Sequence, residues 1–301
     1  MTRSLRELGE DRLLAKILPQ LKQNSQVVTG AGDDCAAVRF RGAKECLLLK
    51  SDCVVEGIHF VAGSSPREVG WKAMMRALSD FAAMSGVPQF ALITLVIAGK
   101  KKVMWVRDLY RGLNQAARYF DVALVGGETS DTDGPTVLVV SVAGFIEADR
   151  RVLRSGGKAN DDLFVTGKLG GSIRRRHLNF VARIEEARWL TANFKVHAMI
   201  DLSDGLGADL PRLARASRLA FSVDEHALPI SRGCTVQQAI SDGEDYELLF
   251  AISRRHRARL ERMWRKKFPK LGLTHIGYLR QRSKIKHQTF LRGYVHFRQR
   301  R

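Results

Sequence analysis

The sequence predicts a two-domain protein of the α/β class with mixed (α+β) sheets. At 301 residues the chain is long enough for two domains of ordinary size. Short apolar runs of strand length alternate with longer amphipathic segments, and acidic or glycine-rich residues recur where these segments end. A polar, glycine-bearing stretch at 150–162 marks the expected boundary, which gives an N-terminal domain over residues 1–148 and a C-terminal domain over residues 149–301.

The N-terminal half is expected to start with an amphipathic helix over residues 1–22, perturbed near its end by Pro19. A second helix should begin near residue 65, because Ser65, Pro66 and Glu68 match an N-cap, a first-turn proline and a capping-box acid. The other elements expected in this half are strands at 36–40, 46–49, 90–98, 122–125 and 137–146, an extended segment at 54–60 and a helix at 105–120.

Asp80 falls in the last third of the helix that begins near residue 65. A carboxylate there faces the negative end of the helix dipole, which costs about 0.3–1 kcal/mol when the carboxylate is unpaired. The position therefore predicts a positive group close to Asp80.

The C-terminal half repeats the order of strand, glycine turn, acids and helix. Asp201 and Asp204 are three residues apart where a helix is expected to start, so both side chains can face the same way. The expected strands lie at 163–166, 221–224, 248–252, 275–279 and 289–297, and the expected helices at 184–194, 207–217, 236–240 and 254–268.

Composition favours a cytoplasmic enzyme-like chain without a membrane span. The longest apolar stretch, residues 90–98, is too short to cross a bilayer, and the charged N-terminus lacks the apolar centre of a signal peptide. The four cysteines show no CxxC spacing, so neither a zinc site nor a disulfide framework is expected.

The net charge of +19 is concentrated at the C-terminal end. Residues 251–301 contain 17 Lys or Arg and a single acid, Glu261. A basic segment of this kind attracts polyanions such as RNA or an anionic membrane surface. The alternative is the solvated face of a folded domain, which we favour because the basic residues are interleaved with apolar ones at helical and strand spacing.

Acids on glycine-rich turns are the main chemical signal. Asp33 and Asp34 follow a glycine turn, and Asp52 follows an apolar run; read alone, they fit an Asx turn and a strand end as well as a Mg²⁺ site. Motifs of P-loop proteins, protein kinases, serine hydrolases and zinc proteases are absent. Mg²⁺ commonly bridges carboxylates to substrate phosphates, so the scattered acids favour phosphoryl transfer.

Seven motifs in order resemble the thiamine-monophosphate kinase family, within the superfamily that includes aminoimidazole ribonucleotide synthetase. The resemblance spans roughly residues 5–300 and rests on GDDCAAV, LLLKSDCVVEGIHF, GWKAMMRALSDFAAMSGVP, VALVGGETS, RSGGKANDDLFVTGKLG, MIDLSDGLGADL and GEDYELLF. It implies an aminoimidazole ribonucleotide synthetase-like fold and a homodimer formed by the N-terminal domains, with ATP bound near the interface. The implied reaction is direct transfer of the ATP γ-phosphate to thiamine monophosphate, with several Mg²⁺ ions and no covalent intermediate.

The resemblance also implies roles for particular residues. The positions implied to bind Mg²⁺ are Asp33, Ser51, Asp52, Asp80, Glu128, Asp201 and Asp204. Those implied to contact ATP are Tyr110, Gly127, Glu128, Arg154 and Ser203, and those implied to contact thiamine monophosphate are His59, Glu244 and Tyr294. On the residues alone, each has an ordinary structural alternative, such as helix core for Tyr110 and a helix cap for Ser203.

Two positions depart from the family pattern. Lys50 stands where the family usually has a hydroxyl residue that helps to bind metal. A protonated lysine cannot ligate Mg²⁺, but its own charge can replace a cation. Glu128 stands where the family usually has aspartate, which displaces the carboxylate by about one C–C bond. The site is therefore expected to hold fewer Mg²⁺ ions than its relatives.

Two other functions remain open at this stage. One is an ATP-dependent enzyme of the same superfamily with a different acceptor; selenophosphate synthesis is disfavoured because no Cys followed by Lys occurs near the N-terminus. The other is a non-catalytic relative that binds nucleic acid through its basic C-terminal segment.

Overall fold

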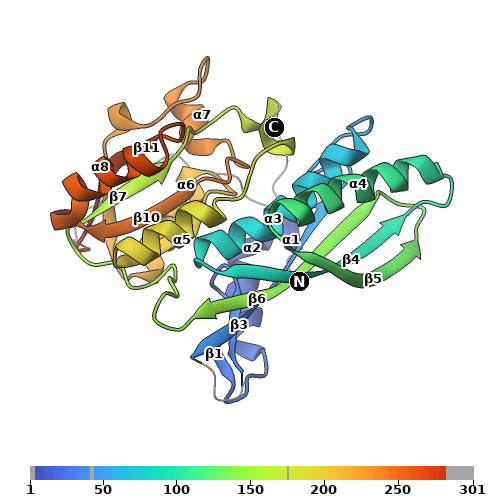
Figure 1. Ribbon diagram of the computed structural model, residues 1–301, viewed down its shortest axis with the longest axis horizontal. Helices are drawn as coiled ribbons and strands as arrows, with labels where there is room; N and C mark the ends of the chain where they lie inside the picture. Colours follow the sequence, from blue (N-terminus) through green and yellow to red (C-terminus); the bar gives the residue numbers. More distant parts are fainter. Residues whose placement is uncertain (1–3, 41–43, 175, 283–301) are drawn as a thin grey trace.

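The computed structural model describes residues 4–40, 44–174 and 176–282. Two β-sheets, each accompanied by helices, form neighbouring halves of the molecule (Figure 1). The strands of the first sheet end at residue 147 and those of the second begin at residue 161. No helix within the described ranges is long and apolar enough to span a membrane.

The N-terminal sheet has six strands in the order β1-β2-β3-β6-β4-β5. All neighbouring pairs are antiparallel except β4 and β5. The strands are β1 (Val27–Thr29), β2 (Ala36–Arg39), β3 (Glu45–Val55), β4 (Val87–Ile97), β5 (Ala123–Asp131) and β6 (Val137–Glu147).

Helices α3 (Pro66–Ala83) and α4 (Val103–Tyr119) cover one face of this sheet (Figure 1). They pack backbone against backbone: a Cβ added to Gly70 would lie 2.1 Å from the Leu109 carbonyl oxygen, and one added to Gly112 would lie 1.9 Å from that of Arg67. Any larger residue at either glycine would push the helices apart. This close packing fixes α3, which supplies much of one cavity wall.

The other face of the sheet carries exposed apolar side chains. Leu49, Phe90, Leu92 and Val125 are between 42 and 56% exposed. Because side chains alternate along a strand, the even-numbered residues of β3 point toward α3 and the odd-numbered ones toward this open face.

The C-terminal sheet is antiparallel, with five strands in the order β8-β10-β7-β11-β9. The strands are β7 (Asp161–Thr166), β8 (Val196–Asp201), β9 (Ala220–Val223), β10 (Leu248–Ser253) and β11 (Leu273–Arg280). The helices of this half are α5 (Ile184–Asn193), α6 (Leu206–Ala216), α7 (Val236–Ser241) and α8 (Arg257–Lys267). Short 3-10 turns occur at η2 (Ser172–Arg174), η3 (Arg176–Leu178), η4 (Glu225–Ala227) and η5 (Arg254–His256).

Two hydrophobic clusters hold these layers together. The larger one runs from α3 and the N-terminal sheet into one face of the C-terminal sheet, where it includes the stacked rings of Phe164 and Phe250 and the buried Trp264 of α8. The smaller one lies on the other face of the C-terminal sheet, against α6. The larger cluster therefore joins the two domains.

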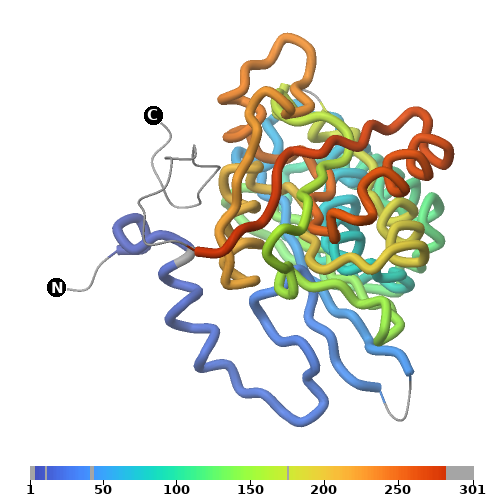
Figure 2. Tube along the Cα trace, turned by 90° about the vertical axis from the view of Figure 1, so that its left-hand side faces the viewer, coloured from blue at the N-terminus to red at the C-terminus, as the bar shows by residue number. Residues whose placement is uncertain are grey.

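The structure differs from the predicted elements in several places. The expected extended segment at 54–60 ends with β3 at Val55, and residues 57–59 form a turn. The N-terminal helix breaks at Gly9, whose φ of 74° suits glycine, into α1 (Leu5–Leu8) and α2 (Glu10–Ile17), followed by η1 (Leu18–Gln20). Figure 2 shows these N-terminal helices, in dark blue, projecting from one side of the molecule. Gly126 and Gly127, expected in a turn, lie inside β5 with positive φ values of 148° and 150°, a backbone conformation that favours glycine. The expected capping bond of Ser65 is absent from the described residues, and the expected strand at 289–297 lies outside them.

Candidate active site

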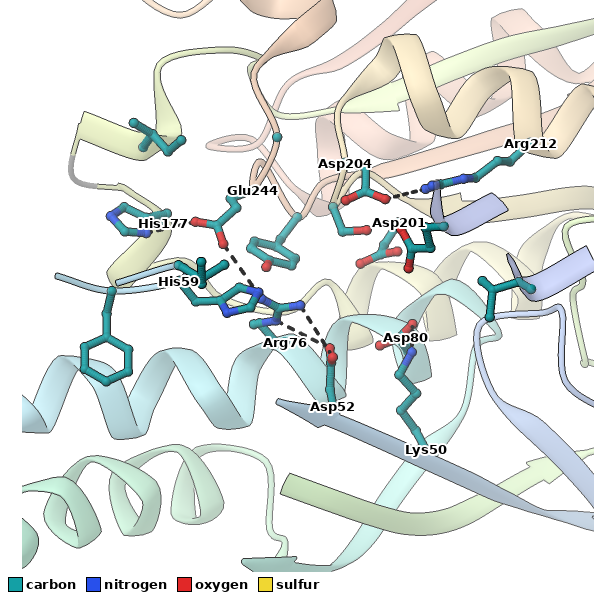
Figure 3. A pocket seen from close by; sticks show the side chains of 18 of the residues that line it. Lys50, Asp52, His59, Arg76, Asp80, His177, Asp201, Asp204, Arg212 and Glu244 are labelled. Atoms are coloured by element: carbon teal, nitrogen blue, oxygen red, sulfur yellow. Dashed lines mark hydrogen bonds and ion pairs between the residues drawn. The ribbon is translucent and has the colours of Figure 1, made fainter. Parts of the chain in front are cut away.

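A cavity of about 1000 Å³ opens between the two domains. Its walls come from β3, α3 and the loop at 57–64 of the N-terminal domain, from the turns at 201–204 and 243–246 and α6 of the C-terminal domain, and from α2. The charged and polar side chains labelled in Figure 3 line it: Lys50, Asp52, His59, Arg76, Asp80, His177, Asp201, Asp204, Arg212 and Glu244.

Three buried carboxylates meet at one end of this cavity. Asp34 precedes β2, Asp80 lies on α3 and Asp201 ends β8, and their ligand oxygens all lie within 4.8 Å of one another. Ser79 Oγ donates a 2.7 Å hydrogen bond to Asp201 Oδ2. The buried Asp34 Oδ2 finds no hydrogen-bond partner among the described residues. We refer to these three residues as the acidic cluster.

Burial makes Asp80 and Asp201 hard to ionise without a cation. It is the main cause that raises the pKa of Asp80 well above its usual range, although Lys50 opposes the shift. Burial and the neighbouring Asp34 raise the pKa of Asp201 to about 6, and the same two causes raise that of Asp33 to about 6. Hard carboxylate oxygens, a shortage of positive charge and an unsatisfied buried oxygen together fit a site for Mg²⁺.

Two basic side chains contact the acidic cluster. Lys50 Nζ lies 2.7 Å from Asp80 Oδ1, which confirms the predicted positive group near Asp80. Arg154 Nη2 lies 2.6 Å from Asp34 Oδ1. Asp201 has no ion pair within the described part of the chain, so three carboxylates share two cations.

The acids that flank the cluster are paired with arginines. Arg76 lies 3.4 Å from Asp52; burial alone would raise the pKa of Asp52, but Arg76 and then Lys50 outweigh burial and lower it. Arg212 binds both Asp204 and the buried Asp209 of α6. Asp52 is therefore ionised without any added ion, whereas burial and the neighbouring Asp204 raise the pKa of Asp209 well above its usual range.

A different arrangement occupies the opposite end of the cavity. The completely buried Lys72 donates to Glu244 Oε2 at 2.7 Å and to the His59 carbonyl oxygen at 2.6 Å. His177 Nδ1 lies 2.9 Å from Glu244 Oε2. Burial would raise the pKa of Glu244, but the His177 hydrogen bond and Lys72 lower it to about 2. We refer to Lys72, His177 and Glu244 as the paired cluster.

The turn at 243–246 holds Glu244 in this position. Glu244 and Tyr246 have positive φ values of 63° and 50°, which are uncommon for residues other than glycine. Tyr246 is buried and its ring stacks on Phe180 with a centroid separation of 3.9 Å. Packing of the tyrosine thus compensates for the strained backbone that aims Glu244 into the cavity.

The structure brings together eight of the predicted site residues and leaves others apart. Lining the cavity are Asp52, His59, Asp80, Arg154, Asp201, Ser203, Asp204 and Glu244. Asp33 lies next to them and accepts from the Arg154 backbone N–H at 3.2 Å. Ser51, Tyr110, Gly127 and Glu128 do not line the cavity, and Tyr294 lies outside the described residues.

The predicted site residues that do not line the cavity make other contacts. Ser51 points to the open face of the sheet, where its Oγ is 2.9 Å from that of Ser141. Glu128 is exposed on the edge strand β5 and accepts a hydrogen bond from the N–H of Thr129. Tyr110 packs partly buried against the larger hydrophobic cluster.

Sequence reasoning missed four residues of the site, which are Lys72, Arg76, His177 and Arg212. It named Asp34 among the candidate acids but left it out of the ligands implied by the family resemblance. One signal was present: Lys72, Arg76 and Asp80 are spaced by four residues, so they share one face of α3. No local pattern marks His177, because only the fold brings its turn to Glu244.

Comparison with known proteins agrees with this architecture. The family model described as AIR synthase related protein, N-terminal domain, matches residues 32–146, and the model of the corresponding C-terminal domain matches residues 140–262. A thiamine-monophosphate kinase of Rhodopirellula baltica is 35% identical over 84% of this chain and 84% of its own length. That of Bacillus subtilis is 32% identical over 97% of this chain and 100% of its own length.

Solved structures show the same similarity. A structure described as AaThiL complexed with AMPPCP and TMP superposes with a TM-score of 0.84 at 29% identity, covering 98% of this chain and 99% of that one. A thiamine monophosphate kinase from Aquifex aeolicus gives a TM-score of 0.76 at 30% identity, covering 93% and 96%. From its two matched domains, its fold and these relatives, the chain belongs to the thiamine-monophosphate kinase family.

Proposed function

We propose that this protein transfers the γ-phosphate of ATP to thiamine monophosphate, giving thiamine diphosphate, in the cavity between its domains. The observation that carries the proposal is the buried acidic cluster, which faces the cavity from two domains and fits a divalent cation. Membership of the family and a related structure described as a complex with AMPPCP and TMP support the choice of substrates. A cytoplasmic location, where ATP is abundant, is part of the proposal.

Mg²⁺ would be held by Asp34, Asp80 and Asp201, with Asp33 and Asp204 beside them. When bound there, it would neutralise negative charge on the phosphates of ATP and of the acceptor. Fixed carboxylates would otherwise repel both substrates, so this end of the cavity depends on the ion.

The chain's own residues position the two phosphates. The guanidinium group of Arg154 reaches the acidic cluster and can donate two parallel hydrogen bonds to a phosphate. Arg76 stands between Asp52 and Glu244, 3.4 Å from the first and 3.8 Å from the second, so it links the two ends of the cavity. The acceptor phosphate is already anionic, and in-line transfer therefore needs neither a strong general base nor a covalent nucleophile.

The paired cluster is the proposed site for the thiamine part of the acceptor. Glu244 stays ionised because its pKa is held at about 2, and its carboxylate can face the positively charged thiazolium ring. His59 lies in the same wall, and its backbone carbonyl is fixed by the buried Lys72. Ser203, in the turn after β8, faces the same cavity and is proposed to contact ATP.

A homodimer through the open face of the N-terminal sheet is a further part of the proposal. The exposed Leu49, Phe90, Leu92 and Val125 form an apolar surface that a second copy would cover. The family resemblance places ATP near the dimer interface, so Gly127 and Glu128 of the edge strand β5 would meet the nucleotide only in the dimer, whereas Tyr110 of α4 lies on the covered side of the sheet. Light scattering on Leu92→Asp is expected to show a monomer; an unchanged mass would exclude this face as the interface.

The direct test is an assay of the purified protein with ATP, Mg²⁺ and thiamine monophosphate, in which thiamine diphosphate is quantified. We expect product that depends on all three components and is lost with EDTA. Folded wild-type protein that makes no thiamine diphosphate would overturn the proposed reaction. Asp108→Asn, on the exposed side of α4, is the matched control for aspartate substitutions in the cavity.

A further inference from the structure

Lys50 places a fixed positive charge inside the proposed metal site. Its Nζ lies 2.7 Å from Asp80 Oδ1, and its side chain is 23% exposed. Lys50 and Asp52 are two residues apart on β3, so both point to the same side of the sheet, toward the cavity. Figure 3 shows the lysine rising from the strand beside Asp52 to meet the carboxylate of Asp80.

The contact changes how many cations the carboxylates need. The ammonium group of Lys50 contacts the Asp80 carboxylate directly, and opposite charges attract more strongly in a partly buried site than in bulk water. Asp52 lies two residues along β3 on the same side of the sheet, so the same positive charge also faces this acid. A divalent ion between Asp52 and Asp80 would have to compete with this charge.

A covalently attached cation has an advantage over one from solution. Mg²⁺ gives up its water shell reluctantly and must be drawn from solution at millimolar concentration. The lysine is part of the strand, and it loses only side-chain freedom when it binds Asp80. Its three N–H groups are donors only, so the Asp80 oxygen that accepts from Lys50 is no longer free to hold a metal on that side.

We propose that Lys50 is a resident counter-ion that takes the place of one divalent cation on the Asp52–Asp80 side of the cavity. The chain then binds one divalent ion fewer than the same chain with a neutral residue at position 50. The ion held by Asp34, Asp201 and the other oxygen of Asp80 is retained, because Lys50 contacts only Oδ1 of Asp80 and has no hydrogen bond to Asp34 or Asp201 among the described contacts. The inference rests on the proposed function only in taking the cavity to be a Mg²⁺ site.

The test counts bound Mn²⁺ on the full chain without nucleotide, by electron paramagnetic resonance of the free ion. Lys50→Met keeps most of the side-chain volume and removes the charge; it is expected to bind about one more Mn²⁺ per chain than the wild type. Lys50→Arg keeps the charge and is expected to match the wild type. Lys101→Met is the control, because Lys101 pairs with Glu56 outside the cavity at comparable exposure.

Thermal unfolding supplies a second readout that needs no turnover. Lys50→Met should unfold at a lower temperature than the wild type in EDTA and recover at least half of the difference in Mg²⁺, whereas Lys101→Met should show no such recovery. Equal Mn²⁺ counts for Lys50→Met and wild type, or a loss of stability that Mg²⁺ does not reverse, would overturn the inference. A protein that lacks kinase activity but gains a cation in Lys50→Met would refute the proposed reaction and leave the role of Lys50 intact.

Discussion

Both ends of the cavity contain carboxylates next to basic side chains, but the pKa values of these carboxylates shift in opposite directions. In the acidic cluster, burial prevails and the pKa values of Asp80 and Asp201 rise. In the paired cluster, burial is comparable, but Lys72 and His177 prevail and the pKa of Glu244 falls to about 2. The two clusters differ in the number of basic side chains that contact their carboxylates. The acidic cluster is therefore expected to bind a cation from solution, whereas the charge on Glu244 is already neutralised by Lys72 and His177.

Helix α3 connects the two ends. Lys72, Arg76 and Asp80 follow one another along a single face, so the helix passes from a buried base to a buried acid within two turns. Burial, with Glu244 opposing, lowers the pKa of Lys72 to about 8. One rigid element thereby fixes the distance between the metal end and the acceptor end.

The strongest test of the acidic cluster compares two neighbouring aspartates. Asp34→Asn removes a carboxylate of the cluster and should reduce kcat/KM by about 100- to 1000-fold, or about 3–4 kcal/mol. Asp33→Asn, outside the cluster, should cost about 10-fold or less. Steady-state kinetics at saturating Mg²⁺ measures both. Equal losses at the two positions would show that Asp33 is as much a ligand as Asp34, as the sequence predicted.

Breaking the paired cluster should reduce stability. Lys72→Met leaves Glu244 with His177 and the more distant Arg76, and the completely buried site cannot admit enough water to replace the ammonium group. The free energy of unfolding should fall by about 1–3 kcal/mol, measured by urea denaturation. Lys101→Met again serves as control. A loss as small as that of the control would mean that the pair contributes nothing to stability.

Removing a carboxylate from the acidic cluster should instead increase the stability of the protein at neutral pH without metal. Because the folded-state pKa of Asp201 is raised from 3.8 to about 6, its contribution to stability is fully present below pH 4 and is lost as the pH rises through about 6. In EDTA at pH 7.5, Asp201→Asn should therefore be more stable than the wild type by about 1–2 kcal/mol. Thermal unfolding at pH 7.5 and at pH 5 should show this advantage shrinking at the lower pH. An advantage independent of pH would assign it to packing rather than charge.

A smaller effect is expected where the paired cluster holds the acceptor. His177→Asn weakens one hydrogen bond to Glu244 and should raise the KM for thiamine monophosphate about 3- to 10-fold, equivalent to about 1 kcal/mol, with little change in kcat. Substrate titration at saturating ATP measures the two constants separately. A fall in kcat without a change in KM would place His177 at the reacting phosphates instead.

Much of the fold could be predicted because local signals and tertiary structure agree. The apolar runs of β4, β6 and β10 and the periodicity of α3 and α4 gave elements close to those observed. The prediction of a turn at Gly126 and Gly127 was wrong, although glycine usually marks a turn. Here Gly127 lies in a strand where an added Cβ would come within 1.8 Å of the Ile93 carbonyl oxygen. The three-residue strand β1 had no signal of its own.

The candidate site was only partly predictable, because the sequence motifs do not show which side chains the fold brings together. Motifs located most of the acids, but adjacent aspartates such as Asp33 and Asp34 cannot be told apart by pattern, since strand orientation decides which one is buried in the cluster. The basic helix α8 fits a folded face: Arg257 pairs with the buried Asp162, and Lys267 with Glu185.

The hydrophobic cluster shared by both domains constrains how the molecule can come apart. Residues of α3 and the N-terminal sheet pack in the same apolar layer as Phe164, Phe250 and Trp264 of the C-terminal domain. Separating the domains would expose this layer to water, so the two halves should melt together as one cooperative unit. The cavity walls, which include α2 and the loop at 57–64, therefore rest on a common apolar core, and we expect substrates to enter without separation of the two domains.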